Sequence, residues 1–139
     1  MLLMESGEMY LEALYVLSLK SDYVRAVNIC DYLGYSKPAV SRAIKLLISE
    51  GYMQKDSRGF LSLTEAGRSV AVSIYERHTI LTDLFTMMGV DSETADQDAC
   101  RVEHYIGDKT FEAVRSYVND HKIRSGETAS SFRAQVNEG

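Results

Sequence analysis

The chain has few of the features that mark secreted or membrane-inserted proteins. It contains only two cysteines in 139 residues, and they lie 70 positions apart, so they form no disulfide framework. No apolar stretch reaches the length of a membrane span, because Glu, Lys or Arg interrupts the longest ones. Residues 1–5 lack the basic flank and apolar core of a signal peptide. We therefore expect a cytoplasmic protein with reduced thiols and no membrane partner.

The acidic net charge is unevenly distributed. The net charge is −5, with a hydrophobic fraction of 45% and a charged fraction of 25%, which is ordinary for a soluble globular protein. Residues 20–68 nevertheless carry eight Lys or Arg against five Asp or Glu, whereas residues 69–139 carry seven against twelve. A basic module inside an acidic protein indicates contact with nucleic acid through one face. The excess is small, so this is supporting evidence only.

Hydrophobic periodicity predicts the order of the secondary-structure elements. Helices are expected over residues 5–19, 26–33, 37–50, 65–88, 92–106 and 109–118, with short strands over residues 52–55 and 60–63. Ser36 has the chemistry of an N-cap, and the single proline, Pro38, stands in the first turn that follows. Helix, helix, turn, helix, two-stranded wing and helix is the order of a winged helix-turn-helix. From residue 119 the period is lost, so we expect a loosely packed end.

The second helix of a helix-turn-helix enters the major groove with its N-terminal residues closest to the bases. Arg42 is suited to guanine or phosphate, and serine hydroxyls are suited to phosphate oxygens. Two further basic residues on the wing are placed for flanking contacts. The candidate DNA-binding residues are Ser36, Lys37, Pro38, Ala39, Ser41, Arg42, Lys45, Lys55 and Arg58. The alternative is a solvated helix face, which by itself also explains a charged stripe.

A second pattern concerns metal binding. Cys100, Glu103 and His104 are spaced i, i+3 and i+4, which on a helix places three metal-binding side chains on one face. The alternative is a half-buried helix with one core cysteine and a solvated Glu–His pair. Further candidates are Met9, Glu12 and His78, although a Met is more often core filler and a lone His is more often a satisfied side chain.

Five segments together resemble a known family. They are EMYLEALY (8–15), SKPAVSRAIKLLISEGY (36–52), LTEAGR (63–68), ERH (76–78) and DACRVEH (98–104). From about Gly7 to Tyr117 the chain is similar to the diphtheria-toxin-repressor and manganese-transport-regulator family of metal-dependent bacterial repressors.

The resemblance implies a ligand set that mixes two branches of this family. Met9, Cys100, Glu103 and His104 match metal ligands of the iron-responsive branch. Glu12 matches a ligand position of the manganese branch, and His78 matches a metal-binding histidine in both. Soft Met and Cys ligands favour iron, cobalt, nickel or zinc over manganese. We therefore expect Fe²⁺ as the signal and Mn²⁺ as the alternative, with Zn²⁺, Co²⁺ or Ni²⁺ able to substitute in vitro.

The chain also departs from the family pattern. Thr82, followed by Asp83, stands where the family often has Glu, and Asp96 stands where the iron branch has another His. The SH3-like domain of the iron branch is expected to be absent, since the length matches the two-domain form. We therefore do not expect a complete second metal site.

These observations predict a mainly α fold. A winged helix-turn-helix DNA-binding domain is expected over residues 1–70, followed by a helical metal-binding and dimerisation domain over residues 71–139. The predicted function is that of a homodimeric repressor that binds double-stranded operator DNA when it holds a divalent metal, with no organic cofactor.

Parts of the sequence are also compatible with two other functional classes. A winged-helix regulator that senses an organic ligand would use a pocket lined by Tyr75, Phe85 and Met87. An enzyme would use Cys100 and His104 as a thiol–imidazole pair, but the sequence offers no orienting group or oxyanion loop. We therefore expect no enzymatic activity.

Overall fold

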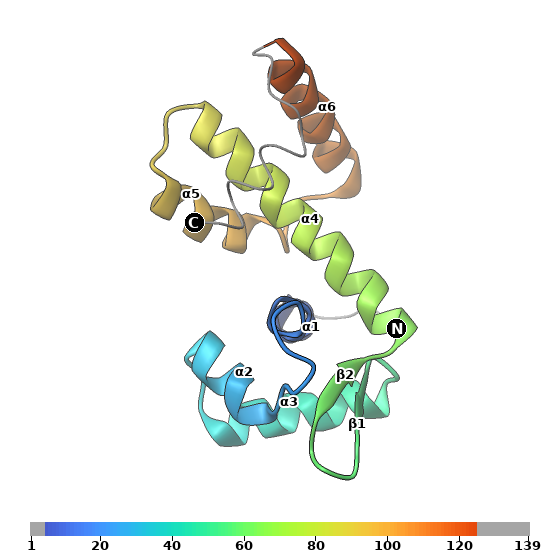
Figure 1. Ribbon diagram of the computed structural model, residues 1–139. Helices are drawn as coiled ribbons and strands as arrows, with labels where there is room; N and C mark the ends of the chain where they lie inside the picture. The colour runs from blue at the N-terminus through green and yellow to red at the C-terminus, as the bar shows by residue number, and fades with distance from the viewer. Residues whose placement is uncertain (1–4, 125–139) are drawn as a thin grey trace. The chain divides into compact units, whose positions relative to one another are not determined.

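The computed structural model describes residues 5–124, which form helices and one small antiparallel sheet (Figure 1). The elements are α1 (Glu5–Ser18), α2 (Ala26–Leu33), α3 (Lys37–Ser49), β1 (Met53–Lys55), β2 (Leu61–Leu63), α4 (Glu65–Met87), α5 (Ser92–Val102) and α6 (Asp108–Arg124). The chain divides into two compact units between Tyr75 and Glu76, so α4 contributes to both. Within residues 5–124, no helix combines the length and the apolar character that a membrane span requires.

The first unit is a helix-turn-helix followed by a wing. Its core contains Leu11 and Leu14 of α1 and Ile29 of α2, and α3 adds the buried side chains Val40, Ile44 and Leu47. These α3 positions repeat at helical spacing, which leaves the opposite face of the helix to solvent. The predicted N-cap is present: the Ser36 hydroxyl accepts a hydrogen bond from the Ala39 backbone N–H at 3.4 Å.

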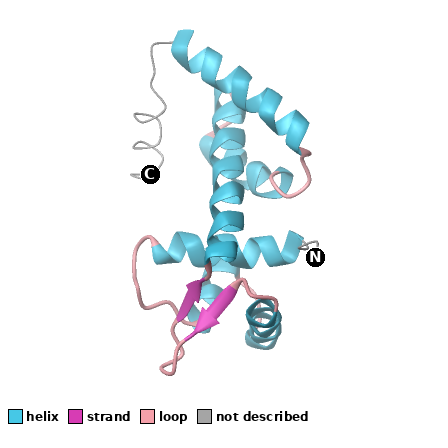
Figure 2. Cartoon of the chain, turned by 90° about the vertical axis from the view of Figure 1, so that its right-hand side faces the viewer, coloured by secondary structure: helices cyan, strands magenta, loops and turns pink. Residues whose placement is uncertain are grey.

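The wing is the two-stranded sheet, drawn in magenta in Figure 2. Strands β1 and β2 pair antiparallel, with Gln54 opposite Ser62. In the turn between them, the Asp56 carboxylate accepts hydrogen bonds from the backbone N–H groups of Phe60 and Arg58, both at 2.9 Å. The hydrogen bond from Phe60 has the largest effect on the pKa of Asp56, and together the two bonds hold that pKa below its ordinary value. Gly59 completes the turn at φ +89°, a conformation that other residues rarely adopt.

The second unit is built from the C-terminal part of α4 together with α5 and α6. Its core consists of Ile80 on α4 with Phe111 and Val118 on α6. Helix α5 begins at the N-cap Asp91, whose carboxylate accepts the Thr94 N–H at 3.0 Å. This bond lowers the pKa of Asp91, because it stabilises the charged form.

Two helix ends differ from the sequence prediction by more than one residue. The helix expected to reach residue 106 ends at Val102, and the segment that follows is a turn in which the Tyr105 N–H bonds to the Val102 carbonyl three residues earlier. Helix α6 runs six residues beyond the expected end at Val118, to Arg124. The buried residue one turn after Val118 is Lys122. Because Lys122 is polar, the hydrophobic periodicity of the helix cannot be followed beyond Val118 in the sequence. Most of the loosely packed end expected from residue 119 lies outside the described residues.

The first prediction concerns Gly67, in the first turns of α4. A Cβ added at this position would collide with the Tyr52 carbonyl oxygen at the base of the wing. Because backbone cannot move away cheaply, Gly67→Ala is expected to lower the free energy of unfolding by about 1–3 kcal/mol or more. Chemical denaturation measures this change.

Gly107 provides the matched control, since a Cβ there would meet nothing within 4 Å. Gly107→Ala should cost less than about 1 kcal/mol, the range of a weaker N-cap residue. Equal destabilisation by the two substitutions would contradict the close approach of α4 to the wing.

Candidate functional site

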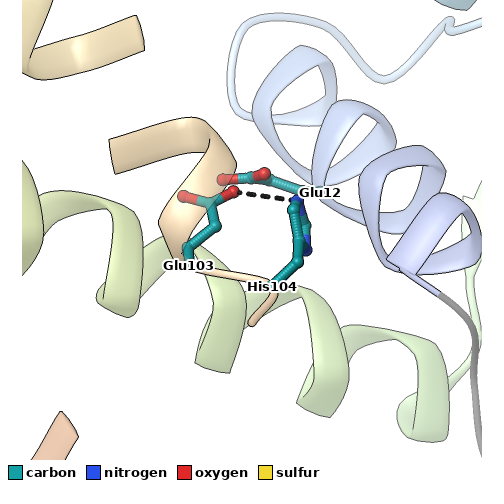
Figure 3. A group of neighbouring side chains, drawn as sticks. All are labelled: Glu12, Glu103 and His104. Carbon is teal, nitrogen blue, oxygen red and sulfur yellow. Dashed lines mark ion pairs between the residues drawn. The ribbon is translucent and has the colours of Figure 1, made fainter. Parts of the chain in front are cut away.

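A buried carboxylate lies at the C-terminal end of α5. Glu103 is fully buried, and its Oε2 lies 2.8 Å from Nδ1 of His78 on α4. Its other oxygen, Oε1, lies 3.3 Å from Nε2 of His104, the ion pair drawn in Figure 3. A charged group out of contact with water is costly unless it is paired or bound to a metal. Two imidazoles around one carboxylate form an N/O donor set of the kind that binds divalent transition metals.

His78 also contacts a second carboxylate in the same unit. Its Nε2 lies 2.7 Å from Oδ1 of Asp96, one turn before Cys100 on α5. His78 therefore faces two acidic side chains of the α5 segment, one exposed and one buried. Sequence reasoning noted Asp96 only as a departure from the family and did not place it in the site. Its i, i+4 spacing from Cys100 was the available signal.

Of the three residues in the Cys-Glu-His pattern, only Cys100 lies within α5. Glu103 is the C-cap residue and His104 follows it, so the three do not share a continuous helix. Cys100 is exposed, Glu103 is fully buried and the His104 side chain is 4% exposed. The alternative of a core cysteine beside a solvated Glu–His pair is therefore wrong. The cysteine is exposed to solvent, and the Glu–His pair is buried.

Thr82 and Asp83, which stand where the family often has Glu, form contacts within the second unit. The Thr82 hydroxyl donates to the His78 carbonyl oxygen at 2.8 Å. Asp83 is buried and forms an ion pair with the equally buried Lys122 of α6. This ion pair joins α6 to α4, the helix that carries His78.

The remaining metal candidates lie in the first unit, on α1. Met9 and Glu12, the third residue labelled in Figure 3, are both partly buried. The Tyr35 hydroxyl donates to Sδ of Met9 at 3.9 Å, and Tyr35 directly precedes the N-cap of α3. Burial raises the pKa of the neighbouring Tyr10, whose ring packs edge-on against Tyr35.

The candidate DNA-binding residues lie on the solvent side of the first unit. Ala39 is half-buried, and the rest are exposed: Ser36, Lys37, Pro38, Ser41, Arg42, Lys45, Lys55 and Arg58. This is the exposure that a DNA-binding face requires. Their assignment as DNA contacts stays a prediction.

Both halves of the chain match one protein family. Residues 2–59 match the N-terminal DNA binding domain of the iron dependent repressors. Residues 64–124 match the metal binding and dimerisation domain of the same proteins. The chain belongs to the iron-dependent repressor family. The predicted family and the predicted fold class, a winged helix-turn-helix followed by a helical domain, are thereby confirmed.

Relatives within this family include regulators named for different metals or functions. The transcriptional regulator MntR of Salmonella typhimurium is 30% identical over 112 residues, covering 81% of this chain and 71% of the relative. The diphtheria toxin repressor of Corynebacterium glutamicum is 27% identical over 119 residues, covering 85% and 52%. The solved structure of the manganese regulator SloR is 27% identical with a TM-score of 0.72, covering 81% and 53%.

The chain spans about half the length of SloR and of the diphtheria toxin repressor. The relatives named here are a transcriptional regulator and a repressor, and proteins of this class were predicted from the sequence. The family models are named for iron and one matching solved structure is a manganese regulator, so family membership leaves the choice of metal open.

The second prediction concerns the Asp83–Lys122 pair. Lys122→Met removes the cation from a buried carboxylate, so it should lower the free energy of unfolding by about 3–5 kcal/mol. The double variant Asp83→Leu/Lys122→Met removes both charges and should recover most of this loss. Chemical denaturation of the wild type, the two single variants and the double variant gives the coupling. Additive effects of the two substitutions would contradict a stabilising role for the pair.

Proposed function

We propose that this protein is a homodimeric repressor that binds double-stranded operator DNA when it holds Fe²⁺. The observation that carries the proposal is the buried Glu103 carboxylate, with His78 Nδ1 at 2.8 Å and His104 Nε2 at 3.3 Å. This donor set belongs to the domain that the family uses for metal binding and dimerisation. Mn²⁺ is the alternative signal.

The proposed metal ligands come from both units of the chain. They are Met9, Glu12, His78, Cys100, Glu103 and His104. The resemblance to the two branches supports all six. The geometry within the second unit supports His78, Glu103 and His104 further. Cys100 and Met9 supply the soft sulfur donors that favour Fe²⁺ over Mn²⁺, which prefers oxygen.

The proposed switch follows from ligands on two units. A bound metal neutralises the negative charge of its carboxylate ligands and restricts the orientations of the DNA-binding unit. Operator binding is favoured when the two recognition helices of a dimer are spaced by about one DNA turn. A coupling of about 1–3 kcal/mol is typical for such a switch, so metal should tighten operator binding roughly 5–150-fold.

The decisive experiment compares operator affinity under anaerobic conditions with Fe²⁺, Mn²⁺, Zn²⁺ or a chelator. We expect half-saturation at a lower Fe²⁺ than Mn²⁺ concentration, because Met9 and Cys100 are soft donors. A preference for Mn²⁺ would assign sensing to the oxygen and nitrogen donors alone. Tight binding that ignores both metal and chelator would overturn the metal switch.

The third prediction identifies the ligands. Cys100→Ala and His104→Ala should each abolish the effect of metal on operator affinity while leaving metal-free binding intact. Matched controls remove the same side-chain types elsewhere, with Cys30→Ala in α2 and His121→Ala in α6. The controls should respond to metal like the wild type. An unchanged metal response in both site variants would eliminate the proposed centre.

The fourth prediction concerns sequence reading by α3. Arg42 is exposed on the face opposite the buried stripe of α3, where a guanidinium suits guanine O6 and N7. Arg42→Ala should weaken operator binding by about 1–3 kcal/mol and relax the preference at one base pair.

Lys45→Ala serves as the comparison for a phosphate contact, and it should weaken binding to all sequences alike. The measurement is affinity for the operator and for duplexes with single base-pair changes. A uniform loss with Arg42→Ala would make Arg42 a backbone contact instead.

A further inference from the structure

Arg77 and His78 are neighbours on α4, and both contact the turn that follows α5. His78 Nδ1 lies 2.8 Å from Glu103 Oε2, where this turn begins. Arg77 contacts its other end, where Arg77 Nη1 donates to the Ile106 carbonyl oxygen at 2.5 Å. His104 lies between the two contacts in sequence. One helix therefore holds both ends of the turn that carries this proposed ligand.

The Arg77 guanidinium is itself fixed in position. It pairs with the Asp108 carboxylate at the start of α6, and its carbon lies 5.0 Å from the Phe111 ring centroid. The Arg77 side chain is 14% exposed. A guanidinium presents its N–H donors in a rigid plane, so one group can bond a carbonyl and a carboxylate at the same time. A lysine ammonium on a flexible stem has no such fixed arrangement of donors.

Ile106 is the point at which the turn is anchored to the second unit. Its side chain packs against the core cluster of Ile80 and Phe111, and its carbonyl oxygen accepts the bond from Arg77. The preceding residue, Tyr105, is 74% exposed. The Arg77 bond thus fixes the backbone at the end of a turn whose middle lies in solvent.

Arg115 shares the Phe111 ring with Arg77 but contacts other groups. Its guanidinium carbon also lies 5.0 Å from the Phe111 centroid, and it pairs with Glu76 of α4 and Glu112 of α6. Within residues 5–124, these pairs join α4 to α6 and do not include the turn that follows α5. The two arginines are therefore matched in charge and in ring contact, and they differ in the contact with that turn.

We propose that Arg77 is a positioning residue for the metal centre, which holds the turn after α5 so that Glu103 and His104 converge with His78. This inference rests on the proposed function, because it concerns the ligands of that centre. Arg77 is not itself a ligand, since a guanidinium is always protonated and accepts no bonds. It acts through the Ile106 backbone. Ligands that are held in place before the ion binds lose less conformational entropy on binding, which raises metal affinity.

The fifth prediction is a loss of metal affinity when Arg77 is replaced. Arg77→Gln should weaken the binding of Mn²⁺ and of Co²⁺ about tenfold, as expected for an outer partner of metal ligands. Arg77→Lys keeps the charge but cannot bond both partners, so its affinity should fall nearly as far. Asp108→Asn leaves the Ile106 contact in place and removes a pair whose acid is 94% exposed. Its affinity should stay within about twofold of the wild type. Titration of chelator-treated protein with each metal measures these changes.

Arg115→Gln is the matched control. It removes the same charge from the same ring, so thermal unfolding in chelator should shift as it does for Arg77→Gln, while metal affinity stays at the wild-type value. The visible absorption of bound Co²⁺ reports the geometry of its ligands, and a loss of stability alone does not change it at saturation. We expect an altered Co²⁺ spectrum for Arg77→Gln and the wild-type spectrum for Arg115→Gln.

The outcomes separate this inference from the proposed function. Wild-type affinity and an unchanged Co²⁺ spectrum in Arg77→Gln would overturn only the positioning role, and Arg77→Lys gives the same test if the glutamine variant does not fold. Equal losses of affinity in Arg77→Gln and Arg115→Gln would also overturn it, because the Phe111 cluster as a whole would then be responsible. Wild-type protein that binds both metals but binds operator equally without them would overturn the proposed switch and leave the positioning role standing. Wild-type protein that binds neither metal would overturn both.

Discussion

The packing of the second unit depends on the partners that compensate the Glu103 carboxylate, which is buried away from water. A buried charge requires compensation by partners in fixed positions, and His78 and His104 supply imidazole nitrogens to its two oxygens. This requirement links α4 to the end of α5 and brings Asp96 to the other side of His78. The carboxylates and imidazoles gathered there are oxygen and nitrogen donors of the kind that bind divalent metals.

A pair of arginines beside one phenylalanine ring occurs twice in this protein. An arginine pair around Phe111 is closed by carboxylates and holds α6 against α4. An arginine pair around Phe60 lies on an exposed wing, where the charge of Arg58 contributes to lowering the pKa of the Asp56 carboxyl. Whether an arginine is structural or available to a ligand is thus decided by the acids around it, which a basic residue count does not reveal.

Local chemistry was enough to predict most of the fold. The Ser36 cap, the apolar stripe of α3 and the turn residues between β1 and β2 act over a few positions, so the winged helix-turn-helix was readable in advance. The expected end of the last helix was wrong where a distant partner decides. Helix α6 continues to Arg124 because Lys122 is buried against Asp83, 39 positions away. Helix α5 ends at Val102, although Val102 and Ile106 keep helical spacing.

The sequence by itself determined the family, the order of the elements and the chemical types available for metal binding, because each of these is carried by residue identity and spacing. Tertiary structure decided which side chains are buried and which meet. It exposed Cys100 while burying Glu103, gave His78 a second carboxylate in Asp96, and carried Arg25 to the tip of the wing. Burial and long-range contact depend on the packing of separate elements, and no local pattern of residues specifies that packing.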